Sequence, residues 1–321
     1  MLRRRFLQMS AGALATSALA GCASVGADAR AGQRLSAAAF HASRRYAQTR
    51  FGRIAYVERG RGEAALFLHG FPLNGFQWRG AIERLAPYRR CMAPDFMGLG
   101  YTEVAAGQSV APEAQVDMLV ALLESLEVAS VDVIANDSGG QAAQILLARY
   151  PARVRTLLLT NCDAENDSPP PALAPVIALS RAGKFVDEWL APWRANTTLA
   201  RSSEGIGGMC YADPAHPTDE ALEYYFAPLM SAERKAMTHA YAISLERNPL
   251  AGIGPALKRS TAPTRIVWGA ADTIFSRGSP EFLNRAFGAS RGVRLLEGRK
   301  LFWPEELPDV VAEEARALWG V

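Results

Sequence analysis

Two neighbouring residues, Asp137 and Ser138, are the strongest candidates for a reactive side chain in this sequence. They lie in a tight polar turn between the alternating apolar run 131–135 and a segment of helical composition, residues 141–150. This pattern predicts a strand that turns sharply into a helix and presents the side chain at the tip of the turn. An ionised aspartate or an activated serine at that tip can attack an electrophilic carbon.

Two overlapping frames of the pattern small-x-nucleophile-x-small fit this turn. Residues 135–139 place Asp137 at the tip, whereas residues 136–140 place Ser138 there. The first frame has alanine and glycine at its small positions, while the second needs Asn136 where strand and helix crowd together. Aspartate also tolerates a positive φ better than most residues. We favour Asp137, and keep Ser138 or a plain glycine-rich turn as alternatives.

Three further segments have the composition of loops around such a site. The tetrapeptide His-Gly-Phe-Pro at 69–72 follows the apolar run 64–68, and residues 95–102 read Asp-x-x-Gly-x-Gly-x-Thr. The run 264–269 leads into Trp-Gly-x-x-Asp, which ends at Asp272. With the turn at Asp137, these motifs resemble the α/β-hydrolase superfamily, nearest its epoxide hydrolase and haloalkane dehalogenase branch, over residues 46–321.

The resemblance implies an α/β-hydrolase fold, with a mostly parallel central sheet flanked by helices and a helical cap insertion. It also implies that Asp137 is the nucleophile, that Asp272 is the catalytic acid, and that the N–H groups of Phe71 and Ser138 form an oxyanion site. The expected substrate is a small, mostly apolar epoxide, halide or ester. We expect no cofactor and no metal.

The sequence departs from this family at the position of the general base. Aligned on the glycine before it and the Pro-Asp pair after it, the expected histidine falls on Leu301, and no histidine follows His239. Three substitutes are open: His239 in the cap, Lys300 beside the vacant position, or a carboxylate such as Asp163 or Asp272 with a raised pKa. General base catalysis contributes about 10²–10⁴-fold, so hydrolysis of an ester intermediate depends on the answer.

Two other functions therefore remain open. One is a degenerate hydrolase that binds a small ligand without turnover, and the other is a serine esterase that uses Ser138. Dehalogenases of the family place a tryptophan beside the nucleophile, where this chain has Ser138, and this weakens dehalogenation. Cap tyrosines could line the pocket or polarise an epoxide oxygen. The candidates are Tyr211, Tyr224, Tyr225 and Tyr241.

The elements that would position these residues divide the chain into core, cap and leader. We predict a leader at 1–22, a flexible tether at 23–45, a core at 46–167 and 256–321, and a cap at 168–255. Strands are expected at residues 50–59, 64–68, 90–94, 131–135, 154–160, 264–269 and 293–297, and helices at 78–85 and 115–126. Strands that alternate with helices predict a right-handed, parallel arrangement.

The first residues have the composition of an export signal. Three arginines at 3–5 resemble a twin-arginine motif, and Leu-Ala-Gly-Cys at 19–22 resembles a lipobox that would lipidate Cys22. We expect a bacterial, exported, periplasmic lipoprotein, held at a membrane by its lipid. Without the three arginines the formal charge falls from +3 to zero, which does not favour nucleic acid as a partner. A small molecule is the expected ligand, and the oligomeric state is left open.

Overall fold

The computed structural model describes residues 35–105 and 107–321. The predicted leader, Cys22 and the first part of the tether lie outside these residues. In the described part of the chain, nine strands form one sheet with the order β1-β2-β4-β3-β6-β7-β8-β9, and β5 pairs with β2. The strands are β1 (Arg44–Thr49), β2 (Gly52–Arg59), β3 (Ala64–Leu68), β4 (Arg90–Pro94), β5 (Glu103–Val104), β6 (Val131–Asp137), β7 (Val154–Cys162), β8 (Thr264–Gly269) and β9 (Ser290–Leu296).

The sheet is parallel from β4 to β9 and antiparallel where β2 pairs with β1, β4 and β5. Strands β3 and β6 lie in its middle, and every residue of both strands is buried. Continuous apolar runs such as 64–68 suit strands that are covered on both faces. The prediction of an α/β-hydrolase fold with a mostly parallel sheet is confirmed.

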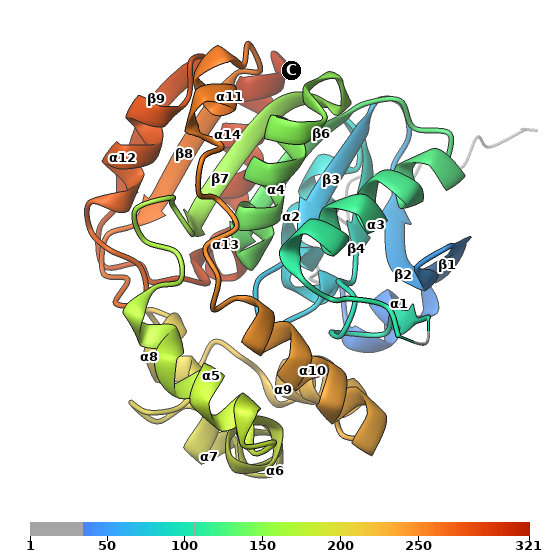
Figure 1. Cartoon of the computed structure of the whole chain (residues 1–321), viewed down its shortest axis with the longest axis vertical. Coiled ribbons are helices and arrows are strands. Elements are labelled where there is room, and N and C mark those ends of the chain that lie inside the picture. The colour runs from blue at the N-terminus through green and yellow to red at the C-terminus, as the bar shows by residue number, and fades with distance from the viewer. Residues whose placement is uncertain (1–34, 106) are drawn as a thin grey trace, which may run out of the picture. The chain divides into compact units, whose positions relative to one another are not determined.

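Helices cover both faces of the sheet, as Figure 1 shows, with α3, α4, α11 and α12 on the near face and α2 and α14 behind it. The helices of the core are α1 (Ala37–Ala42), α2 (Arg79–Leu85), α3 (Pro112–Ser125), α4 (Ser138–Arg149), α11 (Gly254–Arg259), α12 (Ser279–Ala286), α13 (Trp303–Glu306) and α14 (Pro308–Trp319). None of the helices in residues 35–105 and 107–321 is long and apolar enough to cross a membrane.

A helical insertion separates β7 from β8 and gathers at one end of the sheet (Figure 1). It lies within the predicted cap. Its helices are α5 (Ala174–Arg181), α6 (Ala191–Ala195), α7 (Thr197–Ala200), α8 (Ile206–Cys210), α9 (Asp219–Phe226) and α10 (Ala232–Ser244), with a π-helical turn at Val186–Leu190.

The predicted tether is too long at its C-terminal end. Residues 37–45 belong to the folded domain, because they form α1 and the start of β1. Ser36 caps the helix by accepting a hydrogen bond from the N–H of Ala39. The ring of Phe40 is 2% exposed and packs edge-on against Phe76 at 5.2 Å. The small, polar residues of this segment gave no helical pattern in the sequence, because the stability of the helix comes from tertiary packing.

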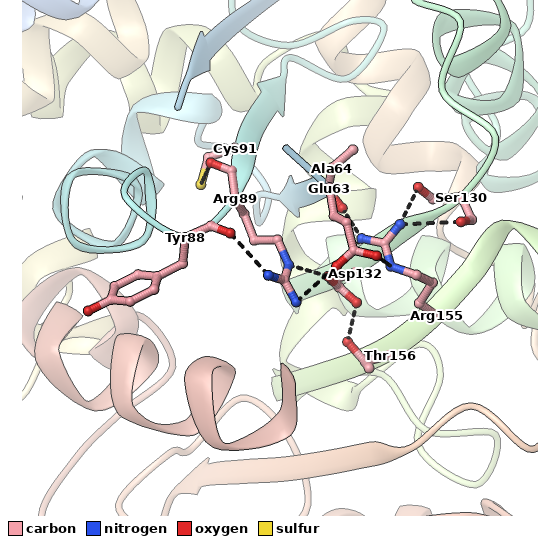
Figure 2. Close-up of polar contacts among 9 residues, drawn as sticks. All are labelled: Glu63, Ala64, Tyr88, Arg89, Cys91, Ser130, Asp132, Arg155 and Thr156. Carbon is pink, nitrogen blue, oxygen red and sulfur yellow. Dashed lines mark hydrogen bonds and ion pairs between the residues drawn. The ribbon is translucent and has the colours of Figure 1, made fainter. Parts of the chain in front are cut away.

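A buried ion cluster lies at the beginning of β6, at the opposite end of this strand from Asp137 (Figure 2). The carboxylate of Asp132 accepts hydrogen bonds from Arg89 Nε at 2.8 Å, Arg155 Nη2 at 2.7 Å and Thr156 Oγ1 at 2.9 Å. Asp132 is 1% exposed, and a buried charge is costly unless it is paired and hydrogen-bonded, as it is here. The cluster joins β6 and β7 to the loop before β4.

Candidate active site

Asp137 occupies the tip of the turn between β6 and α4. Its φ is 53° and its ψ is −130°, and Ser138 is the first residue of the helix. Among the described residues, Glu127 is the one other non-glycine residue with a positive φ. A backbone conformation of this kind costs about 1–3 kcal/mol and persists where the surrounding structure imposes it. The observed geometry corresponds to the frame of residues 135–139.

Two main-chain N–H groups donate hydrogen bonds to the carboxylate of Asp137. The N–H of Phe71 donates to Oδ2 at 2.6 Å, and the N–H of Ser138 also bonds this side chain. The loop can approach so closely because residue 70 is glycine. A Cβ at Gly70 would lie 2.8 Å from both Cβ and Oδ2 of Asp137. Both predicted oxyanion donors therefore bond the carboxylate of Asp137, and that of Phe71 bonds its Oδ2 atom.

Burial raises the pKa of Asp137 to about 7, against the lowering effect of the Ser138 and Phe71 N–H groups. The nearby charge of Asp272 raises the pKa further. Desolvation is the largest cause because the carboxylate is enclosed by apolar side chains and contacts no cation. None of the ion pairs found among the described residues includes Asp137. The side chain can thus be neutral or ionised near neutral pH.

Asp137 lies at the base of a cavity of about 350 Å³ between the sheet and the cap. Its size suits a small molecule, and its wall is mostly apolar. The polar side chains in the wall are Asp137, Ser138, Asp163 and Thr273. The cap contributes most of the aromatic and aliphatic wall, including Phe185, Trp189, Trp193, Ile206, Met209 and Cys210.

Ser138 and one cap tyrosine are brought together at this site. The hydroxyl of Tyr241 donates to Ser138 Oγ at 3.1 Å, and its ring stacks on Phe71 with centroids 5.5 Å apart. Ser138 thus holds a hydrogen bond from the cap on its hydroxyl oxygen while its N–H bonds Asp137. The tyrosine joins the cap helix α10 to both oxyanion donors.

The other three predicted tyrosines lie elsewhere. Tyr211 and Tyr225 donate to Glu305 Oε2 at 2.7 and 3.0 Å, and Tyr224 accepts a hydrogen bond from Arg44. Neither these three tyrosines nor Tyr241 is among the described residues that line the cavity. Glu305 also pairs with the buried Arg79 at 2.6 Å, so these contacts attach the cap to the core.

The predicted acid, Asp272, lies after β8 and is 5% exposed. Its carboxylate accepts hydrogen bonds from Asn161 Nδ2 at 2.8 Å and from the N–H of Ile274 at 2.8 Å. Burial raises its pKa, although these bonds oppose the change. Asp272 is not one of the described residues in the wall of the cavity. It is therefore a buried, hydrogen-bonded carboxyl group behind that wall.

Leu301 lines the cavity and is 3% exposed. Its carbonyl accepts a hydrogen bond from Asn136 Nδ2 at 3.1 Å, so the residue before the nucleophile position holds this loop in place. Lys300 turns to the cap and donates to the carbonyl of Gly208 at 2.6 Å. Lys300 is not found in the described wall of the cavity. At the place of the expected histidine, the wall is apolar.

His239 does not reach the cavity. Its Nε2 accepts the N–H of Val186 at 3.2 Å, which fixes the start of the π-helical turn. The chain has four histidines, and none is among the described residues of the cavity wall. His69 is buried, with Nε2 accepting the N–H of Phe96 at 3.0 Å and burial lowering its pKa. Both side chains have structural hydrogen bonds.

Asp163, which follows β7, is the second carboxylate of the cavity wall. Burial raises its pKa to about 8, and the charge of Asp137 adds to this effect. A hydrogen bond from Ser168 acts in the opposite direction. The sequence offered Asp163 as one of several substitutes for the histidine, without a reason to prefer it. No group of three or more possible metal ligands occurs in residues 35–105 and 107–321.

Comparison with known proteins agrees with this geometry. Residues 65–302 match the family model of the alpha/beta hydrolase fold, and the chain belongs to this family. A cis-3-alkyl-4-alkyloxetan-2-one decarboxylase from Shewanella oneidensis is 26% identical over 239 residues, which cover 70% of this chain and 72% of that protein. A haloalkane dehalogenase from Mycobacterium tuberculosis is 27% identical over 272 residues, 81% of this chain and 89% of the relative.

Solved structures share the fold. That of the epoxide hydrolase CorEH superposes with a TM-score of 0.68 at 21% identity, and the match covers 86% of this chain and 98% of the other. The predicted resemblance to the α/β-hydrolase superfamily is confirmed, with dehalogenase-like and epoxide hydrolase-like neighbours.

Proposed function

We propose that this protein is a hydrolase in which Asp137 attacks an electrophilic carbon of a small, mostly apolar substrate. One observation carries the proposal: the Asp137 carboxylate lies at the strained tip of the turn, faces an apolar cavity, and receives the N–H groups of Phe71 and Ser138. An ionised carboxylate needs no base to attack an epoxide, a halide or an activated ester.

The two N–H groups would act mainly after this attack. Once Asp137 is an ester through its other oxygen, the Oδ2 atom that the Phe71 N–H binds becomes the carbonyl oxygen, and attack of water turns it into an oxyanion. Donors already in place stabilise this charge without reorganisation, and one such donor is worth about 10²–10³ in kcat. The same geometry gives Ser138 no comparable role, because its hydroxyl is bonded by Tyr241 and faces no histidine within the described wall.

The cavity supports an alkyl or aromatic substrate with one polar reacting group. Its wall combines the cap residues Trp189, Trp193 and Phe185 with a few polar atoms near Asp137. The two relatives described above have alkyl groups or haloalkanes in their names, and this agrees with an apolar substrate.

Intact-mass measurement of the folded domain tests the proposal. Wild type and Asp137→Asn are incubated with an epoxide, a bromoalkane and an activated ester. We expect product or a mass adduct only with the wild type. Products from Asp137→Asn at the wild-type rate would overturn the assignment of the nucleophile.

A second function, binding of a small ligand without turnover, is favoured by one observation: Leu301 stands where the histidine is expected. The experiment separates the two functions. A folded wild type that forms neither adduct nor product with any of the three substrates, yet binds apolar ligands in calorimetry, would be a binding protein.

A further inference from the structure

Asp137 and Asp163 are brought together by the register of two neighbouring strands. In the parallel pairing of β6 and β7, Asp137 lies opposite Cys162, and Asp163 is the next residue. Gly140 lets the first turn of α4 lie against the end of β7, because a Cβ there would be 2.4 Å from Cβ of Cys162. Both carboxyl groups end in the wall of the same cavity.

Asp163 is hydrogen-bonded by Gln144 and Ser168, which carry no charge. The side chain of Gln144 donates to the Asp163 carbonyl at 2.7 Å, and that of Gln141 donates to Ser168 Oγ at 3.1 Å. Ser168 can then direct its own O–H at the Asp163 carboxyl group, with which it is hydrogen-bonded. Asp163 is 5% exposed, and no ion pair within the described residues includes it. A buried carboxyl group without a cation favours its protonated form.

We propose that Asp163 is the acid–base partner of Asp137, and that the substrate is an epoxide, whose leaving oxygen needs a proton. This inference rests on the proposed function. It assigns to Asp163 the proton transfers for which the cavity offers no histidine, and it uses a residue that touches the same substrate as Asp137. Asp272 cannot take this role directly, because it lies behind the wall and its carboxylate is bonded by Asn161 and Ile274.

In the first step, one oxygen of ionised Asp137 bonds to an epoxide carbon as the bond between that carbon and the ring oxygen breaks. The ring oxygen takes the proton of Asp163. The product of this step is a hydroxyalkyl ester on Asp137 beside an ionised Asp163. The N–H of Phe71 stays bonded to Oδ2, which is now the carbonyl oxygen of the ester.

In the second step, Asp163 takes a proton from water while the water oxygen adds to the ester carbon of Asp137. The tetrahedral intermediate expels the alkoxide, which takes the proton of the new Asp137 carboxyl group. Asp137 is again ionised, Asp163 is again protonated, and epoxide and water have become a diol. One residue thus acts first as the acid and then as the base, as paired carboxyl groups can.

The electrostatics of the pair agree with this assignment of the proton. Burial raises the pKa of both residues, to about 8 for Asp163 and about 7 for Asp137, where two N–H groups favour the anion. Asp163 therefore keeps the proton in the resting pair. Esterification of Asp137 removes the neighbouring negative charge, so Asp163 becomes easier to ionise when a base is needed.

The test compares two substrates with different leaving groups, styrene oxide and bromohexane. Bromide leaves without a proton, so the first step with bromohexane requires Asp137 alone. For Asp163→Asn we expect styrene oxide turnover to fall at least about 100-fold. The same variant should still be alkylated by bromohexane, and its mass adduct should persist because the ester lacks a base. In the wild type, Asp163 first releases its proton to solvent, which esterification of Asp137 favours, and the adduct should then be hydrolysed to hexanol.

Matched variants distinguish an incorrect role for Asp163 from an incorrect proposed function. Glu165→Gln removes a carboxylate of the same loop that bonds the N–H of Gly252 outside the cavity, and it should behave as the wild type. Styrene oxide turnover by Asp163→Asn within about fivefold of wild type would overturn the role of Asp163 and leave that of Asp137 intact. If the folded wild type reacts with neither styrene oxide nor bromohexane, the proposed function itself fails.

Ser168→Ala provides a second measurement if Asp163→Asn does not fold. It keeps both carboxyl groups and removes the hydroxyl that orients Asp163. We expect about tenfold slower turnover of styrene oxide and a longer-lived bromohexane adduct, since a misplaced base is less effective. Unchanged values for both would overturn the inference.

Discussion

The N–H of Phe71 lies 2.6 Å from Oδ2 of Asp137, so an oxyanion donor is bonded to the carboxylate at the tip of the turn in the resting protein. This contact places the carboxylate before any substrate binds. It also favours the anion of Asp137 against the burial that raises its pKa. The reactivity of the site should therefore depend on pH near neutrality.

Alkylation of Asp137 by bromohexane should become faster as the pH rises through about 7, because only the ionised carboxylate attacks. Asp163, Asp272, Tyr241, Cys162 and Cys210 are the titratable groups around the pair. The rate of adduct formation, measured by mass spectrometry from about pH 5 to 9, should level off above the pKa of Asp137. A rate independent of pH over this range would contradict a raised pKa.

The stability of the folded domain should change with pH in the opposite sense. Because the folded-state pKa of Asp137 lies above its usual value of 3.8, the folded state holds a proton that the unfolded state has lost. The stabilisation is complete below about pH 4 and disappears as the pH rises through about 7. The free energy of unfolding, measured with urea, should show this decline in the wild type. It should decline less in Asp137→Asn, whose buried side chain has no carboxyl group to ionise.

Leu301→His should restore a base at the position where the family resemblance expects one. Leu301 already lines the cavity, and its carbonyl bond to Asn136 does not involve the side chain. In the Asp163→Asn background, the bromohexane adduct should be hydrolysed faster by about 10- to 100-fold. Leu301→Asn serves as a polar control without a base. An adduct equally persistent in both double variants would mean that a histidine at 301 does not reach the ester.

Asp132→Asn should destabilise the fold and leave the reaction at Asp137 unchanged. The change removes the buried carboxylate that Arg89 and Arg155 share and leaves them the more distant, exposed Glu63 (Figure 2). Loss of one partner from a buried pair costs about 3–5 kcal/mol, and about 2–4 is expected here because Arg155 is partly exposed. Urea unfolding measures the loss. Thr156→Val, which removes one neutral hydrogen bond, should cost about 1 kcal/mol.

Cys22→Ser tests the predicted lipid anchor, which lies outside the described residues. If Leu-Ala-Gly-Cys at 19–22 is a lipobox, the wild type should partition into detergent and label with a palmitate analogue. The variant should lose both properties while its cavity chemistry stays unchanged. Equal labelling of the two proteins would contradict lipidation at Cys22.

The sequence was sufficient for the elements whose signals are local. Buried strands such as 64–68 and 90–94 appear as short apolar runs, and the structure has them with the same bounds. The turn at Asp137 was recognisable because its small residues reflect crowding between neighbouring parts of the chain. Helix α1 was missed because only two of its residues, Ala37 and Phe40, are buried, too few for a helical pattern in the sequence. Its burial depends on contacts of Phe40 with Phe76 and with Tyr224 of the cap.

The sequence by itself determined the fold and the turn that carries Asp137, and it has a leucine at position 301, where the family resemblance leads us to expect a histidine. Only the tertiary structure decided which distant side chains join Asp137. Strand register sets Asp163 beside it, helix orientation selects Tyr241 among four tyrosines, and hydrogen bonds to Asn161 hold Asp272 behind the wall. These relations depend on contacts between residues far apart in the chain, for which no local pattern exists.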